Sequence, residues 1–220
     1  MHCLNTSSSL PTSLALTNII QLTDFPVSVC ELRSNIYVGL LNGKIVRVDS
    51  EKRINNFLTL SGTPVSICII KNKLYVLHYG FQVEVLVYDL LAQRVAEWSH
   101  SIADTSNSEY SFALAAVSEK LIVADGTNKK ITVYSTMGEM LKEFPCDDAG
   151  DLTVCSFDNS SFIVSYITSA RITRMDITTG EVLWTYTDLR SPSGLSCLSG
   201  RFVAVASYDS RIIAVLDSKG

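Results

Sequence analysis

Histidine is scarce in this chain of 220 residues and occurs only as His2, His78 and His100. A Cys–His pair or a Ser–His–Asp triad would therefore have to use His78 or His100, and neither lies in a G-x-S-x-G setting. The six cysteines form no C-x-x-C pair, the spacing that many zinc sites use. We accordingly expect a non-enzymatic protein with no catalytic residue, no metal site and no cofactor.

An excess of charge of one sign is also lacking. Lysine and arginine together number 18, and aspartate and glutamate 22, so the net charge is −4. This balance argues against general affinity for nucleic acid, because phosphate binding relies on many clustered Lys and Arg side chains. No uncharged apolar run approaches the roughly 18 residues of a membrane-spanning helix, and Met1–Thr17 lacks the basic region and apolar core of a secretory signal. We expect a cytoplasmic protein without a membrane partner.

What the chain does contain is an internal repeat of roughly forty residues. Five segments begin with a similar short run, at Pro26, Pro64, Ser111, Asp151 and Pro192. Their spacings are 38, 47, 40 and 41 residues, and the longest contains a polar insertion, Ser101–Tyr110. Each segment holds short β-branched and aromatic runs separated by Gly, Asn, Asp and Ser turns, which is typical of a four-stranded antiparallel meander. Because such sheets cover their faces by stacking radially, the sequence predicts an all-β propeller of about five four-stranded blades.

The two ends of the chain lead to a further prediction. The fifth segment stops at Asp217–Gly220, where its fourth strand should begin, whereas Thr17–Thr23 resembles the fourth-strand run Asn55–Leu60. We therefore expect Ile19–Leu22 to pair with Ile212–Leu216 and close the ring, which would hide the last open edge. The domain organisation would be a flexible tail over residues 1–16 and a single propeller domain over residues 17–220. The alternative is a fragment of a larger propeller with six to eight blades.

The third segment carries the clearest family likeness. Its run Leu121–Phe144, LIVADGTNKKITVYSTMGEMLKEF, resembles an NHL repeat, within a chain that resembles WD-like β-propeller repeat proteins. Two other runs are similar to the pyrroloquinoline-quinone-type repeat: Thr173–Trp184, TRMDITTGEVLW, and more loosely Tyr88–Trp98. In this alignment the two tryptophans of the chain fall at equivalent positions of the fourth strand. The NHL resemblance implies a protein-binding scaffold, such as the substrate-recruiting propeller of a tripartite-motif-like ubiquitin ligase system. Since the chain has no RING or B-box pattern of Cys and His, ligase activity would reside in a partner.

Most of the cysteines follow the repeat. Cys30, Cys68 and Cys155 occupy one position on the first strand, where the third segment has Ala115. A position that alternates Cys with Ala favours a small apolar side chain, so we interpret these thiols as core residues and not as ligands.

Basic residues recur at the start of the third strand, each before an isoleucine: Lys44, Lys130, Arg171 and Arg211. Equivalent repeat positions lie on a ring, so these cations would form one basic rim facing a phosphate, an acidic peptide or RNA. The alternative is a structural pairing between blades.

A propeller presents the loops after its second strands, and those between its blades, on one face. There the chain places Tyr79, Phe81, Tyr110, Asn128, Lys129, Tyr208 and Asp209. Aromatic residues among polar ones are typical anchors of a protein interface, so our main hypothesis is a scaffold whose loop face binds a protein partner. Two alternatives stay open: an RNA-binding propeller that uses the basic rim, and a small-molecule hydrolase or quinone-dependent enzyme that uses the central channel.

Overall fold

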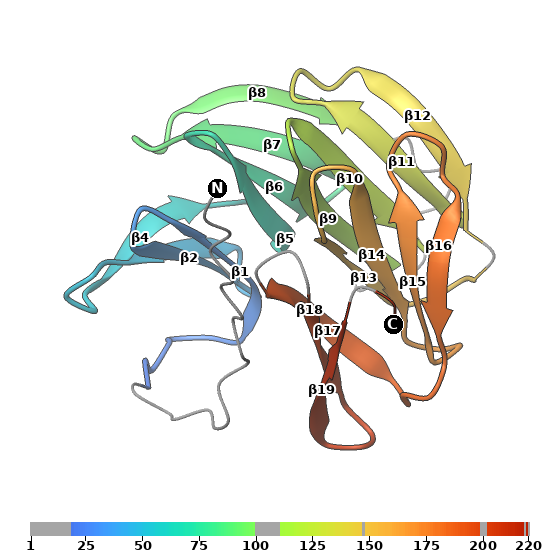
Figure 1. Cartoon of the computed structure of the whole chain (residues 1–220). Helices are drawn as coiled ribbons and strands as arrows, with labels where there is room; N and C mark the ends of the chain where they lie inside the picture. Colours follow the sequence, from blue (N-terminus) through green and yellow to red (C-terminus); the bar gives the residue numbers. More distant parts are fainter. Residues whose placement is uncertain (1–18, 100–110, 147, 199–201, 218, 220) are drawn as a thin grey trace, which may run out of the picture.

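The computed structural model describes residues 19–99, 111–146, 148–198, 202–217 and 219 of the chain. These residues form five antiparallel sheets, each a meander of strands that are consecutive in sequence, and we call them blades 1 to 5. Figure 1 shows the blades arranged around a centre, with blade 1 at the left and blade 5 at the bottom. The predicted all-β propeller of five blades is thereby confirmed.

Within the described residues, four blades have four strands and the fifth has three. The strands are β1 (Pro26–Leu32), β2 (Asn35–Leu40), β3 (Lys44–Val48) and β4 (Ile54–Thr59) in blade 1; β5 (Thr63–Ile70), β6 (Lys73–Tyr79), β7 (Val83–Asp89) and β8 (Arg94–Ser99) in blade 2; β9 (Phe112–Val117), β10 (Lys120–Asp125), β11 (Lys130–Ser135) and β12 (Met140–Pro145) in blade 3; β13 (Leu152–Ser156), β14 (Ser161–Tyr166), β15 (Arg171–Asp176) and β16 (Val182–Tyr186) in blade 4; and β17 (Pro192–Leu198), β18 (Phe202–Ser207) and β19 (Ile212–Leu216) in blade 5.

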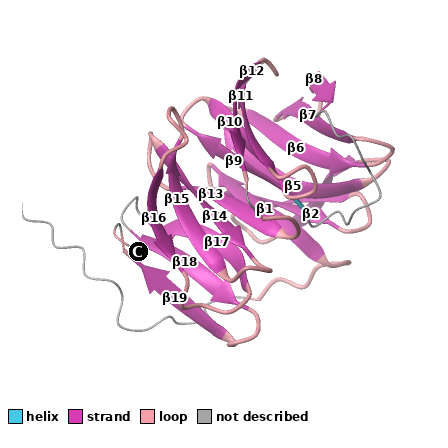
Figure 2. Ribbon diagram, turned by 90° about the vertical axis from the view of Figure 1, so that its right-hand side faces the viewer, coloured by secondary structure: helices cyan, strands magenta, loops and turns pink. Residues whose placement is uncertain are grey.

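The burial of each strand follows from its place in the blade. The middle strands are covered by neighbouring blades on both faces, which explains why β14 is buried at every position and β10 at all but its first. The fourth strands lie at the outer margin, and β12 is exposed at every position except Phe144. The first strands line the centre of the ring, as Figures 1 and 2 show for β1, β5, β9, β13 and β17.

Carboxylate side chains shape the turns between third and fourth strands. Asp49, Asp89 and Asp176 each accept an N–H from the residue two positions later, at 2.7–2.9 Å. The carboxylate thus takes the place of a turn carbonyl, and a residue in the left-handed region completes the turn. That residue is Gly180 (φ +77°) in blade 4. In blade 3 the Ser135 hydroxyl replaces the carboxylate, and the left-handed residue is Gly138 (φ +86°).

A large apolar residue of each fourth strand packs between its own blade and the next one. In the strand register, these residues and their third-strand partners are Leu58 and Ile45, Trp98 and Val85, Phe144 and Ile131, and Tyr186 and Ile172. All four third-strand partners are 0% exposed. Trp98, for example, belongs to one apolar cluster with Val85 of its own blade and with Leu114 and Tyr134 of blade 3.

This register corrects the expected equivalence of the two tryptophans. Trp98 corresponds to Tyr186, whereas Trp184 lies two residues earlier and opposite Arg174. The reason is the turn before β16, in which the N–H of Gly180 bonds to the carbonyl of Asp176, four residues back. The corresponding turn of blade 2 is one residue shorter, so the two strands emerge in different registers.

The predicted closure of the ring is not formed by the described residues. β19 pairs with β18 alone, and Ile19–Leu22 forms no strand. Leu22 instead packs against Val38, Leu40 and Val46 of blade 1, and this contact keeps it away from β19. Thr17 and Asn18 of the predicted strand, and the predicted tail over residues 1–16, lie outside the described residues.

Blades 1 and 5 consequently do not pack against each other as neighbours do. The first strands of successive blades lie side by side from β1 to β17, but β1 and β17 show no comparable packing. Apolar side chains on both blades, including Val29 and Val215, are left exposed. The structure describes no helix that is long and apolar enough to cross a membrane.

Candidate binding face and central channel

The loop face is the side of the ring that carries the loops after the second strands and the connections between blades. Phe81, in the β6–β7 loop, and Tyr208, in the β18–β19 loop, are exposed there. Both loops are held by backbone hydrogen bonds: Gly80 N–H donates to the Gln82 carbonyl at 3.2 Å, and Tyr208 N–H to the Ser191 carbonyl at 3.1 Å. The structure therefore presents two predicted aromatic residues from fixed turns.

Phe25 is a third exposed aromatic residue on this face, and it is not among the predicted loop-face residues. Its carbonyl accepts the N–H of Leu41 at 3.0 Å, which fixes it beside the β2–β3 loop of blade 1. The available signal was its position directly before Pro26, in the connection that precedes a first strand. Tyr110 holds the same position before Ser111 in the third repeat and was chosen there, so the repeat did offer a signal for Phe25.

The remaining predicted loop-face residues have mixed roles. Tyr79 is half-buried, with its ring 6.4 Å from that of Phe112, so it contributes to the core as well as to the face. Asn128 donates from its backbone N–H and from Nδ2 to the buried Asp125 carboxylate, at 2.9 and 2.8 Å, and thereby fixes the β10–β11 turn. Lys129 beside it is exposed.

Asp209 also stabilises a turn, since its carboxylate accepts a hydrogen bond from the Ser191 hydroxyl on the connection between blades 4 and 5. The same connection holds the backbone of Tyr208, so Asp209 helps to position that aromatic ring. Tyr110 and the insertion Ser101–Tyr110 lie outside the described residues.

The predicted basic rim divides into two paired and two exposed residues. Lys130 Nζ lies 3.2 Å from the Glu143 carboxylate. Arg171 lies 2.8 Å from the Asp148 carboxylate, and its guanidinium carbon is 4.4 Å from the centre of the Tyr166 ring. Carboxylates thus already neutralise the cations of blades 3 and 4.

Lys44 and Arg211, the other two rim residues, are exposed. Lys44 begins β3, as Lys130 and Arg171 begin β11 and β15, but Arg211 precedes β19 and has φ +53°. The four cations therefore do not share one strand position. A common anion-binding role for all four stays a prediction.

His78, the last residue but one of β6, lies in a tight space on the loop-face side of blade 2. The imidazole is buried between Gly62 and Gly80, and a Cβ atom at either glycine would lie 2.8 Å from the ring. Burial lowers the pKa of His78, and the Glu84 carboxylate, 3.6 Å from Nδ1, partly opposes this shift. A neutral imidazole enclosed in this way fills space and offers no accessible base.

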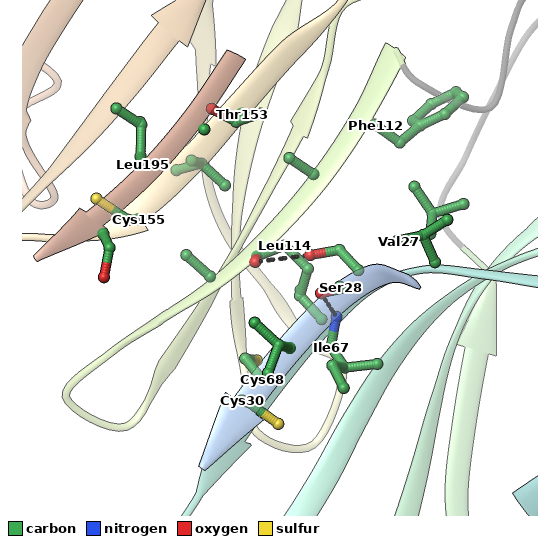
Figure 3. A pocket seen from close by; sticks show the side chains of 18 of the residues that line it. Val27, Ser28, Cys30, Ile67, Cys68, Phe112, Leu114, Thr153, Cys155 and Leu195 are labelled. Carbon is green, nitrogen blue, oxygen red and sulfur yellow. Dashed lines mark hydrogen bonds between the residues drawn. The ribbon is translucent and has the colours of Figure 1, made fainter. Parts of the chain in front are cut away.

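The centre of the ring is a cavity of about 1180 Å³ lined by the five first strands. Hydroxyl groups in its wall join neighbouring blades: Ser28 Oγ accepts the N–H of Ile67 at 3.0 Å, and Ser66 Oγ donates to the Leu114 carbonyl at 3.1 Å (Figure 3). Thr153 Oγ1 is buried with no hydrogen-bond partner among the described residues. The hydroxyls of Ser28 and Ser66 are therefore structural links between strands.

The cysteines of the repeat also line this cavity. Figure 3 shows Cys30 and Cys68 close together on one wall, and Cys155 near Leu195 on another. Burial raises the pKa of Cys30 and of Cys155 to about 12, and raises the pKa of Cys68 well above its ordinary value. The thiols are neutral at physiological pH, and neutral thiols are poor nucleophiles and poor metal ligands.

The acidic groups of the cavity are not arranged as a pair. Glu31 lies near the end of β1, whereas Asp151 precedes the start of β13. Because the first strands run in the same direction around the ring, these two carboxylates lie at opposite ends of the channel. Across the part of the chain that the structure describes, no three His, Cys, Asp or Glu side chains are grouped so as to hold a metal ion.

With this geometry, the chain can be compared with known proteins. No family model and no curated protein sequence matches it. The crystal structure of the WD40 β-propeller domain of Doa1 is similar, with a TM-score of 0.61, 17% identity, and coverage of 86% of this chain and 67% of that one. The chain has the β-propeller fold.

A second similar crystal structure is that of a protein of unknown function from Bacteroides caccae. The TM-score is 0.70 at 10% identity, over 89% of this chain and 78% of that one. At such low identities the likeness concerns the fold alone. The resemblance to NHL-type and pyrroloquinoline-quinone-type repeats, and the alternative of a larger propeller, stay predictions.

Proposed function

We propose that the chain is a protein-interaction scaffold that binds its partner through exposed aromatic residues of the loop face. The observation that supports this most directly is the set of Phe25, Phe81 and Tyr208, which project from three backbone-fixed positions on one side of the ring. Rigid aromatic side chains lose little conformational entropy on binding and bury a large area, so they are frequent hot spots of protein interfaces. The similarity to a WD40 propeller domain is in keeping with this role, because such propellers commonly serve as interaction scaffolds.

The charges favour a protein over RNA as the partner. Lys130 and Arg171, half of the predicted rim, are already bound to Glu143 and Asp148, and the net charge is −4. An RNA surface would need several unpaired cations close together. The finer role, recruitment of substrates to a tripartite-motif-like ubiquitin ligase located on a partner, rests on the NHL resemblance of Leu121–Phe144.

The proposal is tested by affinity capture from the native cells, with partners identified by mass spectrometry. The triple variant Phe25→Ser, Phe81→Ser, Tyr208→Ser removes the aromatic anchors, and we expect it to lose at least tenfold of the captured partner. Leu91→Ser, Met137→Ser is the matched control, because both residues are as exposed as Tyr208 (79% each) but lie in the third-to-fourth turns on the opposite side of the ring.

Both variants should fold, since replacements of exposed side chains usually change the free energy of unfolding by less than about 0.5 kcal/mol. Equal capture by the triple variant and the wild type would refute the loop face as the binding surface. Nuclease treatment separates direct protein partners from those joined through RNA. A RING-containing protein among the specific partners would support the ubiquitin ligase role, and partners without ubiquitin ligase components would count against it.

A further inference from the structure

Blade 1 has a cation at an interior position of the repeat where blades 2 and 3 have valine. Arg47, two residues after Ile45, is paired with Tyr37 in the strand register. Val87 and Val133 hold this position in blades 2 and 3, and each is 1% exposed. Arg47 is half-buried, and its Nε atom is enclosed without a hydrogen-bond partner among the described residues. A charge withdrawn from water in this way costs free energy unless an opposite charge accompanies it.

Arg174 has the same register position in blade 4 and shows how the fold can satisfy a cation there. Its guanidinium binds the Asp158 carboxylate at 2.7 Å, and its Nε donates to the Ser161 hydroxyl at 3.0 Å. The guanidinium carbon also lies 4.3 Å from the centre of the Phe157 ring. The carboxylate comes from the β13–β14 loop. The corresponding turn of blade 1, Arg33–Ser34, is shorter and contains no carboxylate.

Arg47 consequently forms no ion pair within the described part of the chain. It donates to the Tyr37 hydroxyl, and burial raises the pKa of Tyr37, so this partner is neutral at physiological pH. The nearest carboxylate along the chain, Asp49, is bound to Arg53 at 2.8 Å. Asp89, in the turn of the next blade, accepts backbone N–H groups of its own turn. None of these groups supplies the counterion that Arg174 has.

A small open pocket adjoins Arg47, between blade 1 and the β7–β8 turn of blade 2. Its volume is about 210 Å³, and it is lined by Arg47, Asn55, Asn56, Phe57 and Leu90–Ala92. Arg47 is the single charged residue among these lining residues. The pocket is larger than the roughly 150 Å³ cavity that accepts benzene, so it has room for an acid with a few carbon atoms.

We propose that this pocket binds a small monocarboxylate, with the carboxylate on Arg47 and its carbon atoms against Phe57. The carboxylate can belong to a free organic acid or to a glutamate side chain of a partner protein. A guanidinium holds such a group through two parallel N–H···O bonds, and Asn55, the register partner of Arg47, has an amide that can donate beside it. One cation matches a single negative charge, whereas a phosphate dianion would be only half neutralised.

The test follows the full chain by NMR during a titration with sodium butyrate at constant pH and ionic strength. We expect saturable shifts of the side-chain N–H groups of Arg47 and Asn55. 1-Butanol, which lacks the charge, should bind more weakly by about tenfold or more. The tripeptide acetyl-Gly-Glu-Gly-amide is the second arm of the test. If it binds at least as tightly as butyrate, the source is a partner's side chain, and if it binds more weakly, the source is a free acid.

Protein variants locate the site. Arg47→Gln should weaken butyrate binding by about tenfold or more and should not lower the melting temperature of the ligand-free protein, because no ion pair is lost. Asn55→Asp places a carboxylate opposite Arg47, so it should raise the melting temperature and exclude butyrate. Arg53→Gln is the matched control, since Arg53 is an exposed cation of the same blade outside the pocket, and it should bind butyrate within about twofold of the wild type. Arg174→Gln should lower the melting temperature, because it leaves Asp158 unpaired.

Four outcomes would overturn the proposal. They are the absence of saturable shifts at Arg47, equal butyrate binding by Arg47→Gln, equal butyrate binding by Asn55→Asp, and tighter binding of inorganic phosphate than of butyrate at the same resonances. The pocket lies at the third-to-fourth turns, on the side of the ring opposite the loop face. The loop-face triple variant should therefore bind butyrate as the wild type does, and this proposal and the proposed function can fail independently.

Discussion

The indole of Trp98 in β8 lies directly against Gly138, which belongs to the β11–β12 turn of the next blade. A Cβ atom at Gly138 would lie 2.6 Å from Cδ2 of the indole, a separation that real side chains do not reach. Phe144 and Gly180 repeat this relationship between blades 3 and 4. The fourth-strand aromatic residue therefore fixes the position of the following blade, and the glycine provides the space for it.

Replacing Gly138 or Gly180 by alanine should destabilise the fold strongly. Both residues have positive φ, which costs a side-chain-bearing residue roughly 1–2 kcal/mol, and overpacking against the aromatic ring adds roughly 1–3 kcal/mol. We expect each variant to lower the free energy of unfolding by about 2–5 kcal/mol, measured by urea denaturation. Gly194→Ala is the control, because a Cβ there would meet Ala206 at an ordinary 3.5 Å. Similar decreases in the free energy of unfolding for all three variants would show that contact with the aromatic ring is not what makes Gly138 and Gly180 necessary.

The hydroxyl groups of the channel wall should have opposite effects in different blades. Ser28→Ala removes the acceptor of the buried Ile67 N–H. We therefore expect the free energy of unfolding to fall by about 1–2 kcal/mol. Thr153→Val removes a buried hydroxyl that has no partner among the described residues, and should leave the protein equally stable or up to about 1 kcal/mol more stable. The two melting temperatures, compared with wild type, check the prediction, and a destabilised Thr153→Val variant would disprove it.

The strands could be predicted from the sequence because each repeat carries its own local signals. Short β-branched runs and turn residues at a regular spacing give a meander regardless of what surrounds it. Pairing between the two ends of the chain could not be predicted in this way, because it depends on how far the five blades together curve around the centre. The likeness of Thr17–Thr23 to a fourth strand predicted that this segment would pair with β19, but Leu22 packs on blade 1 instead.

The candidate site was less predictable, for two physical reasons. One extra turn residue in Asp176–Gly180 shifts the register of β16, so the residue equivalent to Trp98 is Tyr186 and not Trp184. The partner of Arg171 is Asp148, on a connection between blades that has no repeat pattern. Periodicity identified the cation but gave no information about its partner.

Arg171 and Asp148 should show measurable coupling in a double-mutant cycle with Arg171→Gln and Asp148→Asn. Their contact is 2.8 Å and both side chains are largely shielded, at 29% and 27% exposure. We expect a coupling energy of about 0.5–1.5 kcal/mol, from urea denaturation at low salt. The Arg53–Glu51 pair has a similar distance, 2.9 Å, but is two-thirds exposed, so its coupling should be smaller. A coupling near zero for Arg171 and Asp148 would return Arg171 to the basic rim as a cation available to anions.

The channel thiols should make the protein lose stability in alkaline solution. Burial raises the pKa of Cys30 and Cys155 from 9.0 to about 12 in the folded state. A group whose pKa is raised by folding stabilises the fold fully below its unfolded pKa, and this contribution is lost as the pH rises towards the folded pKa. The loss therefore falls between about pH 9 and pH 12, and a shift of this size corresponds to about 4 kcal/mol for each thiol.

Cys30→Ala and Cys155→Ala isolate this effect from the other groups that titrate in the same range. Alanine is compatible with the position, since Ala115 occupies it in blade 3. Each variant should lose less stability than wild type between pH 9 and pH 11, as followed by urea denaturation at each pH. At pH 8 the wild-type thiols should also react with iodoacetamide far more slowly in the native than in the unfolded protein, because alkylation requires the thiolate. Parallel pH profiles for wild type and both variants, together with fast native alkylation, would mean that water in the channel solvates these thiols and that burial does not raise their pKa.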